Sequence, residues 1–273
     1  MEPFRLVQMR TQVEVLFLKE WMDKLPGLSA GFTTRRGGVS KPPWHSLNCA
    51  LHVGDTPLDV AENRQRVAEA AGFEFDDWTC AEQTHGDHIH AVTASEGGRG
   101  RLFAEDAFAA TDGLVTNVPG VMLSAFYADC VPLYFLDPVH RAVGLAHAGW
   151  KGTAANIAAK TIAKMNQEYG SRAEELFAAI GPAIGSCCYE VDDRVISQID
   201  IKPPARGENG RYMLDLKDVN RQFMIRAGIN PIQLEQSDYC TSCNTELLFS
   251  HRAEKGHTGR MAAWIGWKVE VTP

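Results

Sequence analysis

Long apolar runs are missing from this 273-residue sequence. A helix that crosses a membrane needs about 18 or more consecutive apolar residues. The longest stretch here, residues 121–136, is interrupted by Ser124 and Pro132. The N-terminus also lacks the basic region and the apolar segment of a secretory signal, and residues 12–18 instead alternate in a way that predicts a β-strand. We therefore expect a protein that neither spans a membrane nor carries an export signal.

An excess of basic charge is missing too. The formal net charge is −7, from 27 Lys and Arg against 34 Asp and Glu. General nucleic-acid binders carry clustered positive charge, so the composition argues against that class and leaves room only for a local anion pocket. We expect a small-molecule substrate and no nucleic-acid partner.

The cysteines do not form an obvious disulfide framework. Their number, seven, is odd, and a chain of this length with 45% hydrophobic residues can bury a core without such bridges. We therefore expect free thiols and a cytoplasmic protein. No internal repeat and no linker divides the chain, which predicts a single domain over residues 1–273. The sequence leaves monomer and homodimer equally open.

Strand-like patterns dominate the middle of the chain. Predicted strands cover residues 113–116, 121–126, 131–136, 142–145, 176–180 and 261–267. Several of them are apolar on both faces, which is typical of strands that are covered on two sides by helices or by a second sheet.

Helix signals lie on either side of these strands. Predicted helices cover residues 57–71, 154–169 and 217–227, each followed by glycine. The first begins after Thr56 as N-cap, with Asp59 completing a capping box. On this helix Asn63 and Arg64 lie on or beside the apolar stripe. They must find polar partners or face a cleft, unless this edge of the helix is simply partly solvated.

Three residues from distant segments have the character of metal ligands. His85 lies in a turn before Gly86, Cys130 lies at the junction of two apolar strands, and His147 ends a predicted strand. Each alone has a plainer explanation as a buried or hydrogen-bonded side chain. Together, two imidazoles and one thiolate suit Zn²⁺ and leave a fourth position open, as in catalytic zinc sites. Asp129 would then orient an imidazole or contact substrate.

The strand that ends at His147 leads through Gly149 into a predicted helix. A helix start of this kind favours an anion, and Lys151 adds a full positive charge. Phosphate is the natural ligand, although a turn of this type is often no more than a helix cap.

Other His and Cys residues form incomplete sets. Cys240 and Cys243 have the spacing of half a structural zinc site, and His251 and His257 are the nearest histidines after them. The short separation argues against a four-ligand site of these residues, and we expect a reduced, unligated cysteine pair. His88 and His90 likewise lack further partners in sequence.

A set of short motifs extends over nearly the whole chain. They are Gly31-Phe32-Thr33-Thr34-Arg35, Gly37-Gly38-Val39-Ser40, Ser46-Leu47-Asn48, Gly54-Asp55, Asn63-Arg64, Gln83-Thr84-His85-Gly86, Thr111-Asp112-Gly113, Ala128-Asp129-Cys130-Val131-Pro132, His147-Ala148-Gly149-Trp150-Lys151-Gly152, Gly181-Pro182, Cys188-Tyr189-Glu190-Val191 and Thr258-Gly259-Arg260. With these motifs the chain resembles the YfiH/YlmD family, also called the laccase-domain or polyphenol oxidase family. Its members include purine nucleoside phosphorylases with adenosine deaminase activity.

The resemblance implies an α+β fold of layered mixed β-sheets flanked by helices, in the order α/β/β/α. It also implies that the family's zinc ligands are His85, Cys130 and His147 in this chain. Two positions depart from the common pattern, since Thr84 stands where valine is frequent and Lys151 where arginine is frequent. Lysine keeps the charge but loses bidentate geometry, so phosphate binding would differ in detail.

The resemblance further implies a zinc-dependent purine nucleoside phosphorylase for adenosine, inosine and S-methyl-5′-thioadenosine, with adenosine deaminase activity. Zinc would lower the pKa of water towards about 7 and so supply hydroxide for purine C6. The residues that we predict to hold phosphate are Arg35, Arg36 and Lys151. Those that we predict to hold the sugar or shape a loop are Asn48 and Arg64. Those that we predict to transfer protons are Asp129 and Glu82, and Lys151 is also a catalytic candidate.

Three other functions remain open at this stage. A cysteine hydrolase would use Cys130 as nucleophile and His147 as base, without metal. A copper-dependent polyphenol oxidase is a poor match, because only His88 and His90 have the His-x-His spacing, although Cu²⁺ would bind the three ligands tightly. A metal-stabilised binding protein would show a filled four-ligand site. Metal content and nucleoside turnover separate these hypotheses.

Overall fold

The computed structural model describes residues 2–9 and 12–269. The strands are β1 (Phe4–Gln8), β2 (Glu14–Leu18), β3 (Leu28–Thr33), β4 (Trp78–Cys80), β5 (Ile89–Ala91), β6 (Gly113–Thr116), β7 (Met122–Tyr127), β8 (Val131–Asp137), β9 (Ala142–Ala148), β10 (Phe177–Ile180), β11 (Glu190–Val191), β12 (Tyr212–Met213), β13 (Leu234–Gln236) and β14 (Met261–Trp267). The helices are α1 (Lys19–Lys24), α2 (Pro57–Ala71), α3 (Trp150–Ala154), α4 (Ile157–Tyr169), α5 (Asp193–Ile196) and α6 (Leu216–Arg226).

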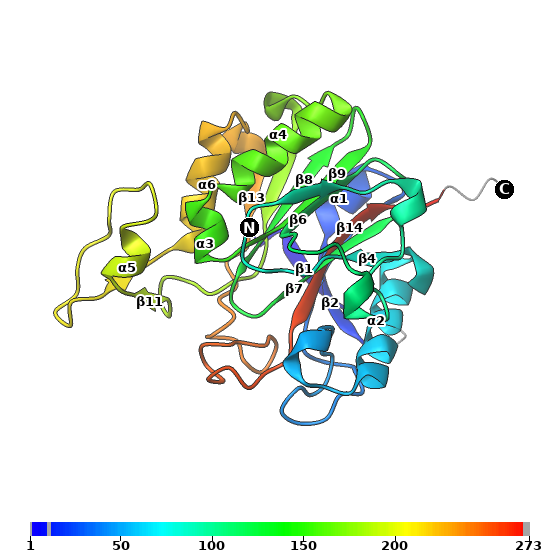
Figure 1. Cartoon of the computed structure of the whole chain (residues 1–273), viewed down its shortest axis with the longest axis horizontal. Helices are drawn as coiled ribbons and strands as arrows, with labels where there is room; N and C mark the ends of the chain where they lie inside the picture. Colours follow the sequence, from blue (N-terminus) through cyan, green and yellow to red (C-terminus); the bar gives the residue numbers. More distant parts are fainter. Residues whose placement is uncertain (1, 10–11, 270–273) are drawn as a thin grey trace.

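In the described part of the chain, most strands belong to two six-stranded sheets. The first has the order β1-β2-β3-β14-β7-β4 and the second the order β13-β10-β8-β9-β6-β5. Both sheets are mixed, because the pairs β4–β7, β5–β6 and β10–β13 are parallel and the other pairs are antiparallel. The two short strands β11 and β12 pair with each other in a segment that projects from the body of the protein (Figure 1).

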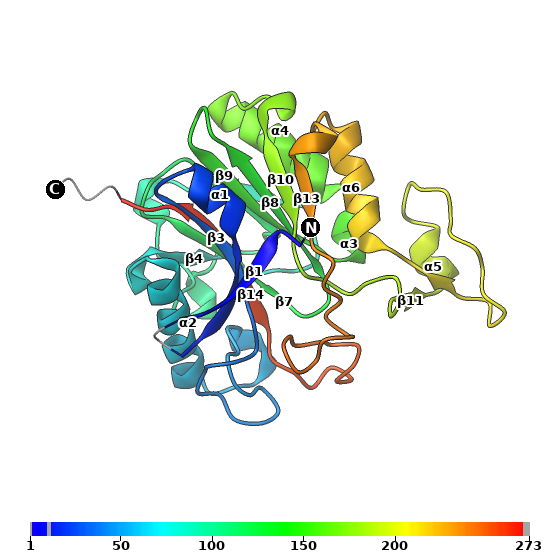
Figure 2. The same ribbon diagram turned by 180° about the vertical axis from the view of Figure 1, so that it is seen from behind.

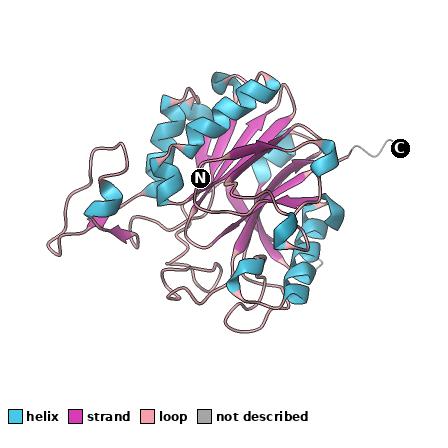
Figure 3. Cartoon of the chain, viewed as in Figure 1, coloured by secondary structure: helices cyan, strands magenta, loops and turns pink. Residues whose placement is uncertain are grey.

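Three apolar layers hold these elements together. One lies between the sheets and joins side chains such as Phe32 and Tyr127 of the first sheet to Tyr134 of the second. A second lies between the second sheet and the helices α4 and α6, and a third lies between the first sheet and α2. Figures 2 and 3 show this order of layers, with the strands stacked at the centre and helices outside. The predicted α+β fold with the order α/β/β/α is therefore confirmed.

Buried tyrosine hydroxyls tie the two sheets to each other. Tyr134 on β8 donates a hydrogen bond to the carbonyl oxygen of Gly31 on β3, at 2.8 Å. Tyr127 on β7 donates to the carbonyl oxygen of Ala146 on β9, at 3.1 Å. A buried hydroxyl without a partner costs free energy, so these contacts favour one alignment of the two layers.

The strand predictions agree closely with the structure, but two helix details were wrong. Thr56 is the N-cap of α2 without any side-chain capping bond, so the expected capping box with Asp59 does not form. The predicted helix after Gly149 is two helices, because Asn156 takes a left-handed conformation (φ 56°) and caps α4 through its side chain. None of the described helices is both long and apolar enough to cross a membrane.

Candidate metal centre

His85, Cys130 and His147 meet at one place in the fold. Their ligand atoms all lie within 4.8 Å of one another, and the two imidazole rings are 4.8 Å apart in an edge-on arrangement. His85 lies on the connection from β4 to β5, and Cys130 on the turn from β7 to β8, so both segments cross from the first sheet to the second. His147 is near the end of β9. The crossing of the chain between the two layers thus brings the three donors together.

Asp112 holds two of these ligands in position. Its Oδ1 lies 2.9 Å from Nδ1 of His147 and accepts a hydrogen bond from the backbone N–H of His85 at 3.0 Å. Its Oδ2 accepts backbone hydrogen bonds from Thr84 at 3.1 Å and Gly86 at 2.6 Å. A carboxylate on Nδ1 of a histidine leaves Nε2 for a metal and fixes the direction of the ring. Sequence reasoning had quoted Asp112 in a motif but had given it no role.

Asp129 does not orient an imidazole, which was one of the two roles we expected for it. Its carboxylate accepts hydrogen bonds from Oγ1 of Thr241 at 2.6 Å and from the backbone N–H of Arg252 at 2.7 Å. It therefore joins the turn that carries Cys130 to the C-terminal loops. Asp129 itself has φ 87° and His85 has φ 60°, both in the left-handed region, which costs free energy and is commonest at functional sites.

Because Gly149 has no side chain, His85 and Cys130 can lie close to its backbone. A Cβ atom at this position would lie 2.9 Å from Cδ2 of His85 and 3.2 Å from Sγ of Cys130. Any side chain here would push against both ligands, so the glycine is required by close approach.

The electrostatics of the site favour a charged sulfur. Burial raises the pKa of the Cys130 thiol, but the neighbouring His147 and His85 outweigh it and lower the pKa to about 6. Burial lowers the pKa of His147, but the negative sulfur of Cys130 and the hydrogen bond to Asp112 outweigh it and raise the pKa to about 9. Without metal, the pair is therefore a thiolate next to an imidazolium at neutral pH. A thiolate is the form of cysteine that binds metal.

The three donors fit a single zinc ion. With Zn–N of about 2.0 Å and Zn–S of about 2.3 Å in a tetrahedron, the three donors would lie roughly 3.3–3.5 Å apart. In the structure they lie within 4.8 Å of one another, so small side-chain rotations would bring them to that geometry. Two imidazoles and a thiolate also suit copper, so the donor set does not fix the identity of the metal. In either case a fourth position remains for water or substrate.

A cleft of about 480 Å³ opens from these ligands, within the range of about 300–1,000 Å³ that is usual for small-molecule sites. Its aromatic lining side chains are Phe126, Trp150 and Tyr189, and its cationic or titratable ones are His52, His251, Arg252 and Arg260. Asp129 and Gln83 complete its polar lining. The cleft thus combines flat apolar surfaces with positive charge.

Asn48, which we predicted as a site residue, holds the backbone of Arg260 at the edge of the cleft. The buried Asn48 accepts a hydrogen bond from the backbone N–H of Arg260 at 2.9 Å, and Nη1 of Arg260 donates to the carbonyls of Thr258 and Gly259. His52 faces the same space from a short helical turn, and the partial burial of its ring together with the charge of Arg260 lowers its pKa to about 4. His52 is therefore neutral at pH 7. Sequence reasoning had quoted Arg260 only within a motif and had missed His52 altogether.

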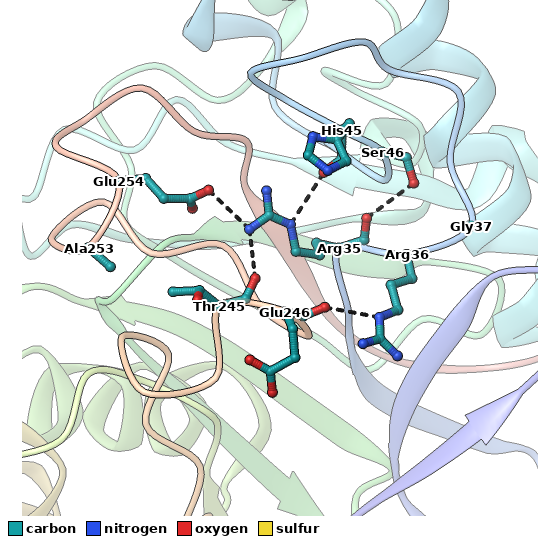
Figure 4. Close-up of a pocket in the computed structure, with 9 residues that line it drawn as sticks. All are labelled: Arg35, Arg36, Gly37, His45, Ser46, Thr245, Glu246, Ala253 and Glu254. Atoms are coloured by element: carbon teal, nitrogen blue, oxygen red, sulfur yellow. Dashed lines mark hydrogen bonds and ion pairs between the residues drawn. The ribbon is translucent and has the colours of Figure 1, made fainter.

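Arg35 and Arg36, which we predicted to hold phosphate, line a second pocket of about 600 Å³ instead (Figure 4). The nearly buried Arg35 donates to the carbonyl of Thr245 at 2.7 Å and pairs with Glu254 at 3.0 Å, and Arg36 donates to the carbonyl of Glu246 at 2.9 Å. This pocket is not the one that His85, Cys130 and His147 line, so the geometry gives the predicted phosphate role little support.

The other predicted site residues take diverse positions. Glu82 accepts a hydrogen bond from the backbone N–H of Ala110 at 3.2 Å and lines a neighbouring pocket, which Arg64 also lines. Arg64 is 2% exposed and donates to backbone carbonyls, and Asn63 beside it is fully buried, so neither residue lies on a solvated helix edge. Lys151 is exposed on α3, with its Nζ 5.7 Å from the ring centre of Trp150.

Known proteins resemble this chain over nearly its whole length. Residues 29–268 match the family model described as multi-copper polyphenol oxidoreductase laccase. The purine nucleoside phosphorylase YlmD of Geobacillus stearothermophilus is 45% identical over 90% of this chain and 92% of its own length. The protein of the same name from Bacillus subtilis is 38% identical over 97% of this chain and 98% of its own.

Solved structures agree with this relationship. A crystal structure of the hypothetical protein YfiH from Bacillus licheniformis has a TM-score of 0.91 at 46% identity, covering 98% of this chain and all of that one. The crystal structure of YlmD from Geobacillus stearothermophilus has a TM-score of 0.92 at 41% identity, with the same coverage. The chain therefore belongs to the YfiH/YlmD family, the laccase-domain family whose curated relatives carry the names of purine nucleoside phosphorylases.

Proposed function

We propose that this protein is a zinc-dependent purine nucleoside phosphorylase that also deaminates adenosine. The relatives named above supply the reaction class. The observation that carries the proposal is the cluster of His85, Cys130 and His147 at one side of a cleft that also holds aromatic and cationic side chains. Adenosine, inosine and S-methyl-5′-thioadenosine are the proposed substrates.

Phosphorolysis breaks the bond between C1′ and the purine nitrogen and forms a bond from C1′ to a phosphate oxygen. The leaving purine takes up one proton. The enzyme must therefore hold an anion beside C1′ while positive charge develops on the sugar. Arg260 and Arg252 are the guanidinium groups that line this cleft, and we assign them to the phosphate in place of Arg35 and Arg36.

The purine requires a flat surface and a polar edge. Tyr189 and Trp150 line the cleft with aromatic rings, and the guanidinium of Arg252 lies 5.2 Å from the ring centre of Tyr189. Stacking against such rings favours any purine, so this surface supports binding of several nucleosides. Asp129 is the acidic residue of the cleft lining and is our candidate for moving the proton; Glu82, in the neighbouring pocket, is the alternative.

Deamination replaces the C6 amino group of adenosine with oxygen from water and releases ammonia. His85, Cys130 and His147 would hold the zinc ion, which would act as a Lewis acid and lower the pKa of water to about 7, the chemistry that this reaction needs. Asp112 contributes by fixing the ring of His147 and the turn of His85.

The test measures purine release and inosine formation from each nucleoside, with and without phosphate, on the wild type and Cys130→Ala. We expect phosphate-dependent base release and phosphate-independent deamination in the wild type alone. Wild-type protein that holds zinc in this cleft but performs neither reaction would refute the proposal.

Arg260→Gln tests the phosphate assignment. Removal of a charged hydrogen-bond donor costs about 1.5–3 kcal/mol, so the KM for phosphate should rise about 10- to 100-fold. Arg36→Gln is the matched control and should leave this KM unchanged. The opposite pattern would restore the phosphate role that we predicted for Arg36.

One observation favours a second function. Cys130 and His147 form a thiolate–imidazolium pair without metal, as a cysteine hydrolase requires. Hydrolysis of esters or amides by chelator-treated protein, lost on addition of zinc, would support that function. A multicopper oxidase needs several histidine-rich sites, and in the described part of the chain one histidine-containing set converges.

A further inference from the structure

A second cluster of possible ligands lies outside the trio and contains only sulfur. The Sγ atoms of Cys187, Cys188, Cys240 and Cys243 are all within 4.8 Å of one another. Sγ of Cys243 lies 3.5 Å from that of Cys187 and 3.4 Å from that of Cys188. All four are free thiols. We refer to these four residues as the thiol cluster.

Two adjacent turns build the thiol cluster. Ala183 and Cys240 form a parallel β-bridge, and the backbone N–H of Thr241 donates to the carbonyl of Ala183 at 3.1 Å. After this bridge one chain segment turns with Cys188 N–H donating to the Gly185 carbonyl, and the other with Cys243 N–H donating to the Cys240 carbonyl. Each turn therefore contributes two sulfurs: Cys240 and Cys243 have the C-x-x-C spacing of structural zinc sites, and Cys187 and Cys188 are direct neighbours.

The surroundings are adapted to a charged sulfur. The backbone N–H of Gly185 donates a hydrogen bond to Sγ of Cys240 at 3.2 Å. A Cβ atom on Gly185 would lie 3.2 Å from Sγ of Cys187 and 3.5 Å from Sγ of Cys240. A hydrogen-bond donor aimed at a sulfur stabilises its negative form and is a common partner of metal-bound thiolates. A side chain at this position would crowd both sulfurs, so glycine suits the close approach of the backbone.

We propose that the thiol cluster is a structural zinc site, distinct from the centre formed by His85, Cys130 and His147. Four thiolates around one zinc ion at about 2.3 Å have sulfur–sulfur separations of about 3.8 Å, a few tenths of an ångström more than the 3.4 and 3.5 Å that separate Sγ of Cys243 from Sγ of Cys188 and Cys187. Four sulfur donors in a tetrahedron are typical of zinc and of iron–sulfur centres, and the metal analysis below separates the two. With all positions taken by protein, such a site stabilises the fold and performs no chemistry. The proposal does not depend on the reaction proposed above.

The place of the thiol cluster indicates what the bound ion would stabilise. Ile184 and Tyr189, on the first turn, line the substrate cleft. Thr241, on the second turn, donates the hydrogen bond to Asp129 beside the metal ligand Cys130. The guanidinium of Arg252 donates to the Cys188 carbonyl at 3.3 Å. Zinc in the thiol cluster therefore holds one wall of the cleft in shape.

The experiment counts zinc in protein purified under reducing, chelator-free conditions. We expect about two equivalents per chain in the wild type, about one in Cys130→Ala and about one in Cys243→Ser. Ser242→Ala is the matched control, since it removes an oxygen from the same turn without removing a ligand, and it should keep both equivalents. The zinc kept by Cys130→Ala should exchange for Co²⁺ with the absorption of a tetrathiolate site.

Several results would overturn this inference. One is a wild type with a single equivalent that Cys243→Ser retains. Another is a disulfide among the four cysteines in protein purified without air, and a third is iron in place of zinc. If Cys243→Ser does not fold, the Co²⁺ spectrum of Cys130→Ala decides instead, because that variant leaves the thiol cluster intact. A protein that binds both zinc ions but converts no nucleoside would refute the proposed function and leave this inference standing.

Discussion

The two ligand clusters of this protein differ in donors, setting and support. The trio mixes nitrogen with sulfur, lies where the chain crosses between two sheets, and is held by the carboxylate of Asp112. The thiol cluster is all sulfur, lies on two turns, and is supported by a backbone N–H group. An ion in the trio would keep one position open towards a cleft, whereas an ion in the thiol cluster would be enclosed by four sulfurs. The comparison teaches that the donor atoms and the groups that hydrogen-bond to them distinguish a candidate catalytic metal site from a candidate structural one.

The largest expected difference is in kcat/KM between the variants Cys130→Ala and Cys243→Ser. Loss of a catalytic metal removes several kcal/mol of transition-state stabilisation, so Cys130→Ala should lower kcat/KM for nucleosides by about a thousandfold or more. Cys243→Ser should leave kcat/KM within about tenfold, because it acts only through the shape of the cleft wall. Steady-state assays on zinc-loaded variants provide the measurement, and equal losses in the two variants would remove the distinction.

Asp112→Asn addresses the support of the trio. Replacement of the carboxylate partner of a metal-bound histidine typically costs about 10- to 100-fold in metal affinity, and we expect that loss in the cleft alone. Asp137→Asn is the matched control, since Asp137 is also buried and pairs with a histidine, His140, at 2.8 Å. Competition with a coloured chelator measures the affinity. An unchanged affinity in Asp112→Asn would show that the trio does not need its carboxylate.

The pH dependence of alkylation separates the two kinds of sulfur in metal-free protein. His147 and His85 lower the pKa of Cys130 to about 6, although burial opposes them, so its thiolate forms as the pH rises through 6. Hydrogen bonds with Cys188 and Cys187 raise the pKa of Cys243 above its usual range, so its thiolate forms only at alkaline pH. At pH 7 iodoacetamide should label Cys130 at least about tenfold faster, although Cys243 is more exposed. Peptide mass spectrometry over a pH series measures both rates, and a rate for Cys130 that rises only above pH 8 would contradict the prediction.

Two glycine substitutions give the smallest and sharpest contrast. Gly149→Ala places a Cβ against His85 and Cys130, and overpacking of about 1 kcal/mol should weaken metal binding in the cleft several-fold. Gly185→Ala places one against Cys187 at a slightly longer distance and should weaken only the thiol cluster, and by less. Zinc affinities of the two sites in both variants are the readout. An equal effect on both sites from either substitution would mean that the sites are not independent.

The sequence was most informative where a pattern is local. Strands β6 to β9 have apolar side chains on both faces, so their bounds were predicted to within a few residues. The break at Asn156 was missed, because nothing in the neighbouring pattern announces a left-handed residue inside a helical segment. Local periodicity fixes which elements form, but single backbone reversals depend on contacts that the pattern does not contain.

The site was predictable only in part for a related reason. The donor types and strand-end positions of His85, Cys130 and His147 indicated a metal centre, and the structure brings the three together. The role of Asp112 depends on how the turn of residues 84–86 folds onto it, which no spacing reveals. The positive charge of Arg35 was visible in the sequence, but its partner Glu254 is more than two hundred residues away, so no local pattern showed that the charge is paired. The contact between the thiols of Cys188 and Cys243 was not predicted either, because these residues are far apart in sequence.

The hydrogen bond from Thr241 to Asp129 has a thermodynamic consequence. Thr241 follows one sulfur of the thiol cluster and Asp129 precedes the sulfur of the trio, so this contact joins the two turns that carry ligands of the two sites. Linkage is reciprocal: whatever factor one occupied site adds to the affinity of the other, it must receive in return. The same contact would therefore pass a small part of any loss at one site to the other, in equal measure in both directions.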